Sequence, residues 1–401
     1  MSDTRVVKVR AVEKVTEEQL EKYNRAQGES AFLTEKDLRS SIKSIRQTIK
    51  NEEVRLRLKY KWLQHQNMIG LITFMLSLIS LVMIGIMYIK RRIHWGFVVP
   101  MMALPGSIMH EIEHDLIHNL YFKSKQWVQH AMFFVIWFTK MSIPPWYRKM
   151  LHLRHHVVSG QRRDIEERLI GLGMPLGWLR WIVTLNPFTV TLILGDIQKD
   201  NKKDWNKDKL VLASIPTIIP LVVLWHLLLS FIRLQLGLTM GAYDPVHYLP
   251  LWLWPYVRDA SVLILLPNLL RQACLNLMAS YSHYYGDIPQ NNVYYQNQII
   301  DHWLMYPFQL FCFNFGATHI FHHFIPNQPF YLRQMLSKKA KEECVAHGIR
   351  RNDFGIVRRN NRYFEHDEER EEEEEKLLAQ FEEEELKMMH DAQDNGLPDE
   401  Q

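Results

Sequence analysis

Cysteine is scarce in this chain, and no internal repeat stands out. The three cysteines, Cys274, Cys312 and Cys344, are scattered and odd in number. They therefore form neither a disulfide framework nor a zinc knuckle, and they are consistent with a reducing compartment or with burial in a membrane. The first 65 residues are rich in charge and contain no long apolar run, so no cleavable signal peptide is expected.

Charge is distributed unevenly along the chain. Residues 365–385 contain 13 acidic and two basic residues and sum to −11, whereas the other 380 residues sum to +15. An acidic run of this kind is typically a solvated or disordered tail. We therefore expect that deletion of residues 366–401 leaves the activity of the protein largely unchanged.

Long apolar runs exclude a purely soluble or fibrous protein. Residues 69–89 carry no charge over 21 positions, and crossing a hydrocarbon core takes about 20 residues. Three further runs follow at residues 95–109, 210–232 and 249–277. They predict about four transmembrane helices in two hairpins. The shorter apolar segments at residues 127–143 and 174–194 are expected to be half-buried or to lie at the membrane interface.

Basic residues indicate the orientation, because Lys and Arg near the ends of spans favour the cytoplasm. Residues 148–209, between the hairpins, contain twelve of them, and the turn at residues 90–92 contains three. Both termini and the central loop are therefore predicted to be cytosolic. The expected fold is an all-α integral membrane protein with a cytosolic helical cap. Its expected parts are a polar arm (1–66), a membrane and catalytic domain (67–335) and a charged tail (336–401).

Histidine is abundant, at 19 of 401 residues, and nine histidines fall into three short blocks. The blocks are His110-x-x-x-His114-x-x-x-His118, His152-x-x-His155-His156 and His319-x-x-His322-His323. Helical residues at i, i+3 and i+4 share a face, so each block is predicted to aim its imidazoles at one point. Imidazole suits iron, zinc and copper, and eight convergent imidazoles exceed what one tetrahedral zinc uses. The blocks therefore predict a site for two metal ions.

These blocks resemble the three histidine boxes of the membrane fatty acid desaturase and hydroxylase superfamily. His114-Asp-Leu-Ile-His118 followed by Asn-Leu-Tyr-Phe resembles the first box, and His319-Ile-Phe-His322-His323-Phe-Ile-Pro326 resembles the third. The 34 residues from His118 to His152 are similar to the family's spacing between boxes one and two. The resemblance covers residues 69–335, and it implies metal ligands in all three boxes.

Two histidines depart from the usual pattern. His110 lies upstream of the usual first-box pair and is the ninth candidate ligand; a first-box pair of His110 with His114 is ranked below His114 with His118. His283 lies in Tyr281-Ser-His-Tyr-Tyr-Gly286, which is loosely similar to a motif of the alkane hydroxylase branch, and it is a further candidate ligand. Orienting carboxylates are expected among Asp115, Glu111, Glu113 and Asp301, because metal-bound histidines usually donate their second nitrogen to such groups.

The resemblance implies an O2-dependent desaturase that uses two iron ions to introduce a double bond into a lipid acyl chain; a lipid or alkane hydroxylase is the alternative. Side chains acting as acids or bases do not remove hydrogen from an unactivated methylene, so a metal oxidant is required. No His-Pro-Gly-Gly haem motif is present. Electrons are therefore expected from a separate donor, such as cytochrome b5 or ferredoxin with its reductase. An endoplasmic reticulum location fits the cytosolic arms, and no nucleic acid partner is expected.

Two other interpretations come from different classes. His110-Glu111-x-x-His114 matches the zinc metallopeptidase signature, in which the glutamate acts as general base. An intramembrane peptidase would leave the two His-x-x-His-His blocks without a function. A non-catalytic scaffold or metal sensor is the other alternative, although all eight box histidines are intact.

Overall fold

The computed structural model describes residues 32–202, 205–238 and 250–364, and residues 40–364 form one compact unit. Every regular element in these described residues is a helix, so the prediction of an all-α protein is confirmed. Two isolated β-bridges, His283 with Asn297 and Ile299 with Arg351, are the extended pairings there. Most of the predicted arm, residues 1–31, and the acidic tail from residue 365 on lie outside the described residues.

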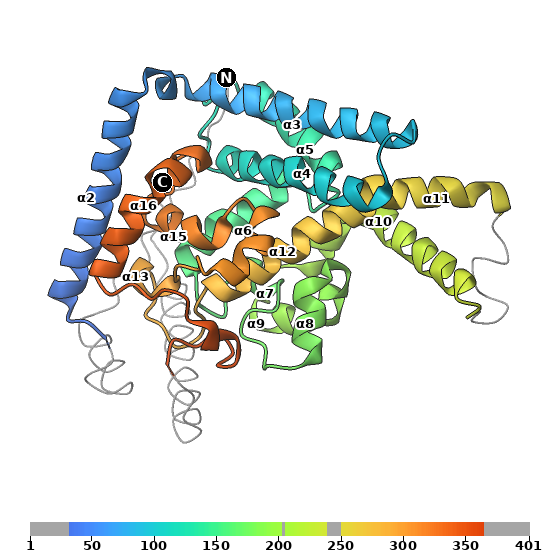
Figure 1. The fold of residues 1–401 in the computed structure, drawn as a ribbon. Helices are drawn as coiled ribbons and strands as arrows, with labels where there is room; N and C mark the ends of the chain where they lie inside the picture. The colour runs from blue at the N-terminus through green and yellow to red at the C-terminus, as the bar shows by residue number, and fades with distance from the viewer. Residues whose placement is uncertain (1–31, 203–204, 239–249, 365–401) are drawn as a thin grey trace, which may run out of the picture. The chain divides into compact units, whose positions relative to one another are not determined.

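The helices of the first half are α2 (Glu35–Lys59), η1 (Lys61–Gln64), α3 (Gln66–Ile89), α4 (Trp95–Ile117), α5 (Gln126–Lys140), α6 (Pro145–Val158), α7 (Ile165–Arg168), α8 (Trp178–Leu185), η2 (Pro187–Leu192) and α9 (Leu194–Asp200). Those of the second half are α10 (Lys207–Gln235), η4 (Leu251–Leu253), α11 (Trp254–Ala260), the π-helical turn η5 (Ser261–Leu265), α12 (Leu266–Ser282), α13 (Val293–Gln296), η6 (Trp303–Met305), α14 (Tyr306–Leu310), α15 (Phe315–Phe324), α16 (Phe330–Ala346) and η7 (Phe354–Val357). Figure 1 shows α4 and α12 near the middle of this unit, where α4 packs on α3, α5 and α12, and α12 packs on α8 and α15.

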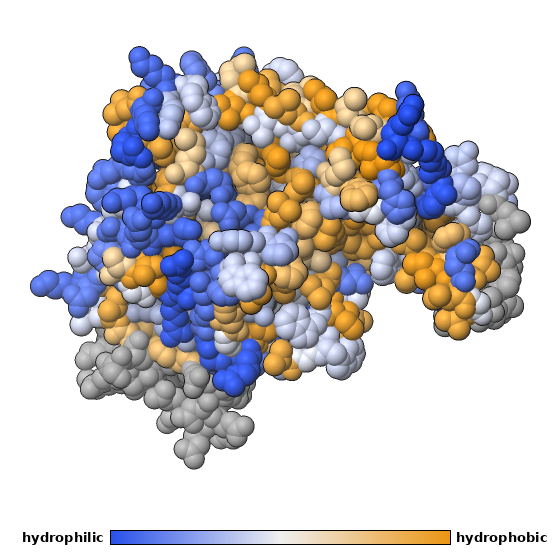
Figure 2. Space-filling view, viewed as in Figure 1, coloured by the Kyte–Doolittle hydropathy of each residue, from blue (hydrophilic) through white to orange (hydrophobic). Residues whose placement is uncertain are grey.

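Three helices of the described residues are long and apolar enough to cross a membrane: Gln66–Ile89, Lys207–Gln235 and the continuous helix Trp254–Ser282. They correspond to three of the four predicted spans. Most of the α3 and α10 side chains are not buried against the protein, and apolar residues gather on the surface over these helices (Figure 2). The outward-facing apolar surface is what a lipid environment stabilises.

The remaining predicted span, residues 95–109, forms the first part of α4. This helix is continuous through Pro100 and Pro105 and ends at Ile117. Its second half carries the first histidine block and is buried in the protein, so α4 as a whole lacks the apolar character of a span. A fourth membrane crossing therefore stays a prediction.

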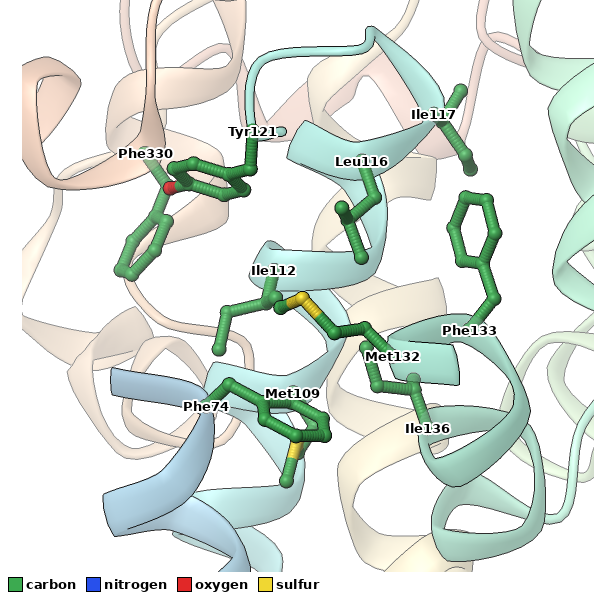
Figure 3. Packing of buried hydrophobic residues seen from close by; sticks show 10 residues of the cluster. All are labelled: Phe74, Met109, Ile112, Leu116, Ile117, Tyr121, Met132, Phe133, Ile136 and Phe330. Carbon is green, nitrogen blue, oxygen red and sulfur yellow. The ribbon is translucent and has the colours of Figure 1, made fainter. Parts of the chain in front are cut away.

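One side of α4 is held by an apolar cluster that joins α3, α4, α5 and the start of α16 (Figure 3). Ile112 and Leu116 are one helical turn apart and fully buried in it, beside Met132 and Phe133 of α5. Burial of such a side chain stabilises the fold by about 1.5–3 kcal/mol. Because this face of α4 is fixed against the cluster, the histidines on the other side of the helix have a fixed direction.

The third histidine block lies on α15, which approaches α12 closely. A Cβ atom at Gly316 would lie 2.4 Å from Cε of Met278 and 3.2 Å from the carbonyl oxygen of Ile300, so glycine permits a close approach here that a larger residue would disturb. His319 follows three residues later on α15, and His283 directly follows the last residue of α12. The close approach at Gly316 therefore brings these two histidines together.

Segments outside the predicted catalytic domain also support it. Asn361 Nδ2 donates to the carbonyl oxygens of Ser280 and His283, at 2.5 and 3.0 Å. Arg46 of α2 donates from Nε to the carbonyl oxygen of Phe324 at 3.1 Å, directly after the third block. The compact unit of residues 40–364 thus includes parts of the predicted arm and tail.

Candidate metal centre

The structure brings eight histidines into two groups. Group A consists of His114, His118, His152 and His322, and group B consists of His155, His283, His319 and His323. Within each group the nearest ligand atoms all lie within 4.8 Å of one another. Both groups draw on several helices, so each depends on the tertiary fold.

Each His-x-x-His-His block is divided between the groups, which corrects the expectation that one block aims three imidazoles at one point. His152 belongs to group A and His155 to group B; His322 belongs to group A, whereas His319 belongs to group B. The helical turn explains the division. Residues i and i+3 point about 60° apart and residues i and i+4 about 40° apart, and the i, i+4 pairs stay together.

Nε2 nitrogens converge in both groups. In group A, Nε2 of His118 lies 3.1 Å from Nε2 of His152. In group B, Nε2 of His319 lies 3.1 Å from that of His283 and 3.0 Å from that of His323. Two nitrogens that each lie about 2.1 Å from one ion are separated by about 3.0–3.4 Å. The observed separations therefore fit ligands of a shared metal ion.

His156 lies outside both groups as defined but next to group A. Its Nε2 lies 3.2 Å from Nε2 of His152 and 2.8 Å from Nε2 of His322. It therefore has the position of a further ligand beside group A.

His110 is the one candidate that the structure does not bring to this centre. Its Nδ1 lies 3.0 Å from Nζ of Lys140, and its Nε2 lies 3.2 Å from a guanidinium nitrogen of Arg148. Both ring nitrogens thus face cationic side chains. His114 belongs to group A, whereas His110 belongs to neither group. Glu111 accepts a hydrogen bond from Arg333 at 3.1 Å. The peptidase interpretation therefore has no assembled site within the described residues.

Carboxylates and carbonyls orient several of the histidines through Nδ1. His152 donates to Glu166 and His155 donates to Asp164, both at 2.8 Å. His283 donates to the carbonyl oxygen of Ala279 at 2.9 Å. A proton held on Nδ1 leaves the Nε2 lone pair free to face a metal ion, so this arrangement fits a metal site.

Electrostatics reinforce the pair of His155 and Asp164. Both side chains are buried. Burial disfavours the imidazolium, but the Asp164 carboxylate and its hydrogen bond outweigh burial and raise the pKa of His155 to about 10. The Asp164 carboxylate therefore stabilises positive charge on the His155 ring, and its hydrogen bond with Nδ1 fixes the ring orientation.

None of the four predicted carboxylates forms a hydrogen bond with a histidine of group A or B among the described residues, and Asp115 alone lies near one. Asp115 accepts from Tyr121 and from the backbone of Phe330, at 2.7 and 3.0 Å, and lies 3.9 Å from His114 Nδ1. Glu111, Glu113 and Asp301 all pair with lysine or arginine side chains. The observed carboxylates come from Asp164-Ile-Glu166, eight to ten residues after the second block. This short acidic run was the signal in the sequence that could have identified them.

A cavity of about 470 Å³ lies beside both groups. His114 and His152 of group A and His155 and His319 of group B line one part of it. Most of its remaining wall is apolar. This part comes mainly from η2, α9 and α10 and from residues beside α5 and α7; examples are Ile143, Leu169, Phe188, Val190, Leu210, Ile218 and Val222. An aliphatic chain is the ligand that such a wall accepts best.

Comparison with protein-family models matches residues 93–355 to the fatty acid desaturase family. The chain belongs to this family. The matched region contains all nine converging histidines, Asp164 and Glu166, and it extends beyond residue 335. A search of curated proteins gives no match.

Membership of the fatty acid desaturase family confirms the resemblance seen in the three histidine blocks. It identifies the chain as an oxidoreductase of lipid metabolism and implies a lipid acyl substrate at a membrane. Desaturase-family proteins generally use two irons, and groups A and B are two sets of imidazoles able to hold metal ions.

Proposed function

We propose that this protein is an O2-dependent membrane desaturase that introduces a double bond into a lipid acyl chain and uses two iron ions. The observation that carries the proposal is the pair of four-histidine groups beside an apolar cavity, in a chain of the desaturase family. Group A with His156 would hold one ion, and group B would hold the other. When bound, the irons supply the oxidising power for removing hydrogen from an unactivated methylene.

The side chains around the ions position and protect the reaction. Asp164 and Glu166 keep a proton on Nδ1 of His155 and His152, so the Nε2 atoms keep their direction. The apolar wall of the cavity orients an aliphatic chain and excludes water. A chain held in this way exposes a defined pair of methylenes to the histidine groups.

For the location, we propose four membrane crossings with both termini and the loop of residues 148–209 in the cytosol. The endoplasmic reticulum suits this orientation. Electrons would come from a separate donor, such as cytochrome b5 or ferredoxin with its reductase. The support is the excess of basic residues in that loop and the positive-inside rule.

A hydroxylase of the same superfamily is the second candidate. It is favoured by His283, which lies in the motif loosely similar to the alkane hydroxylase branch and belongs to group B. The two reactions differ in the geometry around the reacting carbons, and the products have different masses.

Accurate-mass lipid profiling tests the proposal. A host expressing the full chain is compared with hosts expressing His155→Ala and, as a matched control, His130→Ala, which changes an exposed histidine outside the blocks. A desaturase produces species lighter by two hydrogens, with the wild-type chain and with the control but not with His155→Ala. Species heavier by one oxygen would make the hydroxylase the better assignment, and no difference from an empty host would contradict both.

A further inference from the structure

The cavity beside the histidine groups is open between η2 and α10. Most side chains of its wall are buried or half-buried, and the exposed ones are Thr191 of η2 and Val211 and Ile219 of α10. Val211 and Ile219 are 47 and 48 % exposed and lie on a helix long and apolar enough to cross a membrane. The cavity therefore reaches the surface of the protein beside this helix.

The first turn of α10 is anchored beside the opening. Nε1 of the buried Trp205 donates to the hydroxyl oxygen of Tyr147 at 2.9 Å, and the backbone nitrogen of Lys207 donates to Oε1 of Gln198 at 2.8 Å. Leu210 packs in an apolar cluster with residues of α6, α8 and α9. One edge of the opening therefore has a fixed position relative to the cavity.

The other edge of the opening has the character of a membrane-interface segment. In α8, Trp178, Ile182 and Leu185 are exposed, whereas Arg180 is buried. No side chain of η2 is buried, and α9 packs on both η2 and α10 (Figure 1). A short helix with exposed tryptophan and aliphatic side chains is stabilised at the boundary between headgroups and acyl chains. The opening therefore faces this boundary.

Lys207 lies at the end of the cavity-facing side of α10. It precedes Leu210, Val211 and Ser214, which all line the cavity, by three, four and seven residues, and residues at this spacing share one face of a helix.

The side chain of Lys207 is half-buried and has no carboxylate partner among the described residues, whereas Lys199 pairs with Asp196 and Arg168 pairs with Asp200. A lysine at the membrane surface attracts the phosphate of a lipid headgroup. The opening thus combines an apolar entrance with a cation at its polar end.

We propose that the acyl substrate is carried by a membrane phospholipid, whose chain enters the cavity laterally between η2 and α10 and whose phosphate pairs with Lys207. This inference rests on the proposed function and names its substrate class. The apolar wall accepts the aliphatic chain, while the ester and the phosphate stay at the membrane interface. A coenzyme A thioester also carries phosphates, but it approaches from water, and the exposed side chains of Val211 and Ile219 lie on a helix surface that lipid covers.

The experiment measures photolabelling of the purified full-length chain in bilayer discs of dioleoyl phosphatidylcholine. Three probes carry the same stearoyl chain with a diazirine near its middle: a phosphatidylcholine, a diacylglycerol and a coenzyme A thioester. Peptide mass spectrometry counts the labels on Leu275 and Ala279 of α12, which line the cavity and are buried. A probe reaches these residues only from inside the cavity.

The variants change the cation and the entrance separately. Lys207→Gln removes the charge, Lys207→Arg keeps it, and Val211→Trp narrows the opening. Lys209→Gln is the matched control, because it alters an exposed lysine of the same turn that points about 200° around the helix from Lys207.

Wild-type and Lys209→Gln proteins are expected to be labelled about 5-fold more by the phosphatidylcholine than by the diacylglycerol. Lys207→Gln should remove this preference, and Lys207→Arg should retain it. Val211→Trp should lower the labelling by both lipids about 10-fold.

Equal labelling by the two lipids in the wild type, or undiminished labelling in Val211→Trp, would overturn the inference. Stronger labelling by the thioester than by the phosphatidylcholine would place the entrance on the aqueous side and would also overturn it. If Val211→Trp does not fold, Lys207→Gln decides, because it alters a side chain at the rim.

Lipid profiles of hosts expressing the same variants separate this inference from the proposed function. Unsaturated products together with labelling that does not depend on Lys207 would overturn the phospholipid site and leave the desaturase intact. Labelling that depends on Lys207, without a product lighter by two hydrogens, would support the phospholipid site and contradict the desaturase.

Discussion

The two histidine groups differ in how firmly the protein holds them. In group B, all four histidines are buried, and three have a hydrogen-bond partner for Nδ1: Asp164 for His155, the Ala279 carbonyl for His283 and Gln296 for His323. In group A, Glu166 holds Nδ1 of His152. His114 has no hydrogen-bond partner for either ring nitrogen among the described residues, and His322 has none for Nδ1.

Group B is therefore prearranged by the fold, whereas the geometry of group A depends more on its ion. Orienting hydrogen bonds keep the correct tautomer and ring direction before a metal binds. In group A, His118 is also only partly buried. We therefore expect group A to release its ion to a chelator faster than group B.

The largest expected effect comes from removing one ligand of each group. His118→Ala and His319→Ala should both lose turnover to below detection, because both ions are needed, and each should lower the iron content by about half. Iron per chain is measured by elemental analysis of purified protein, with His130→Ala as the control. Normal iron content in His319→Ala would contradict the assignment of group B.

A smaller effect is expected from the orienting carboxylates, and it should be specific to one group. Asp164→Asn and Glu166→Gln keep the side-chain size but weaken the hold on Nδ1, so the iron affinity should fall about 10- to 100-fold. Asp164→Asn should act on group B and Glu166→Gln on group A. Each carboxylate substitution is also combined with His118→Ala or with His319→Ala, so that one intact group remains. Chelator titration of these double variants then shows which group has lost iron affinity. Asp301→Asn, which alters a carboxylate paired with Arg351, should leave both affinities unchanged.

The apolar cluster behind α4 offers a way to disturb group A alone. Ile112→Ala leaves a cavity and should lower the free energy of unfolding by about 2–5 kcal/mol. Because α4 carries His114 and His118 but no member of group B, chelator release from group A should accelerate more than release from group B. Thermal unfolding measures the loss of stability, and the time course of iron release to a chelator measures the release from each group. Equal acceleration of release from both groups would show that α4 supports the groups alike.

The smallest effect is expected for His110→Ala. His110 lies between Lys140 and Arg148, outside both groups, so the iron content should stay at the wild-type level and turnover should fall only mildly. Iron analysis and lipid profiling check this result. A loss as large as that of His155→Ala would place His110 among the ligands.

The sequence predicted the helical class, three of the membrane-length helices and the histidines of the centre. These features are local: they rest on the length of apolar runs and on the period of a helix. The identity of the orienting carboxylates could not be derived in this way. Glu113 is closer in sequence to His114 than Asp164 is to His155, yet Glu113 turns toward Lys140 and Arg148.

Arg271 illustrates the same limit. In the sequence it is one of three charges within the apolar run of residues 249–277, and nothing there indicates that its side chain is buried and lines a cavity. That property depends on α4, α5 and the segments around α8, which surround α12 in space.

The sequence by itself determined that nine histidines at helical spacing would be presented near membrane helices, because side-chain direction repeats with every helical turn. The tertiary structure decided which histidines belong together. Residues i and i+3 of a block diverge enough that the packing of α4, α6, α12 and α15 assigns His152 and His155, or His319 and His322, to different groups. Helix packing sets these distances, and no pattern within a single helix contains them.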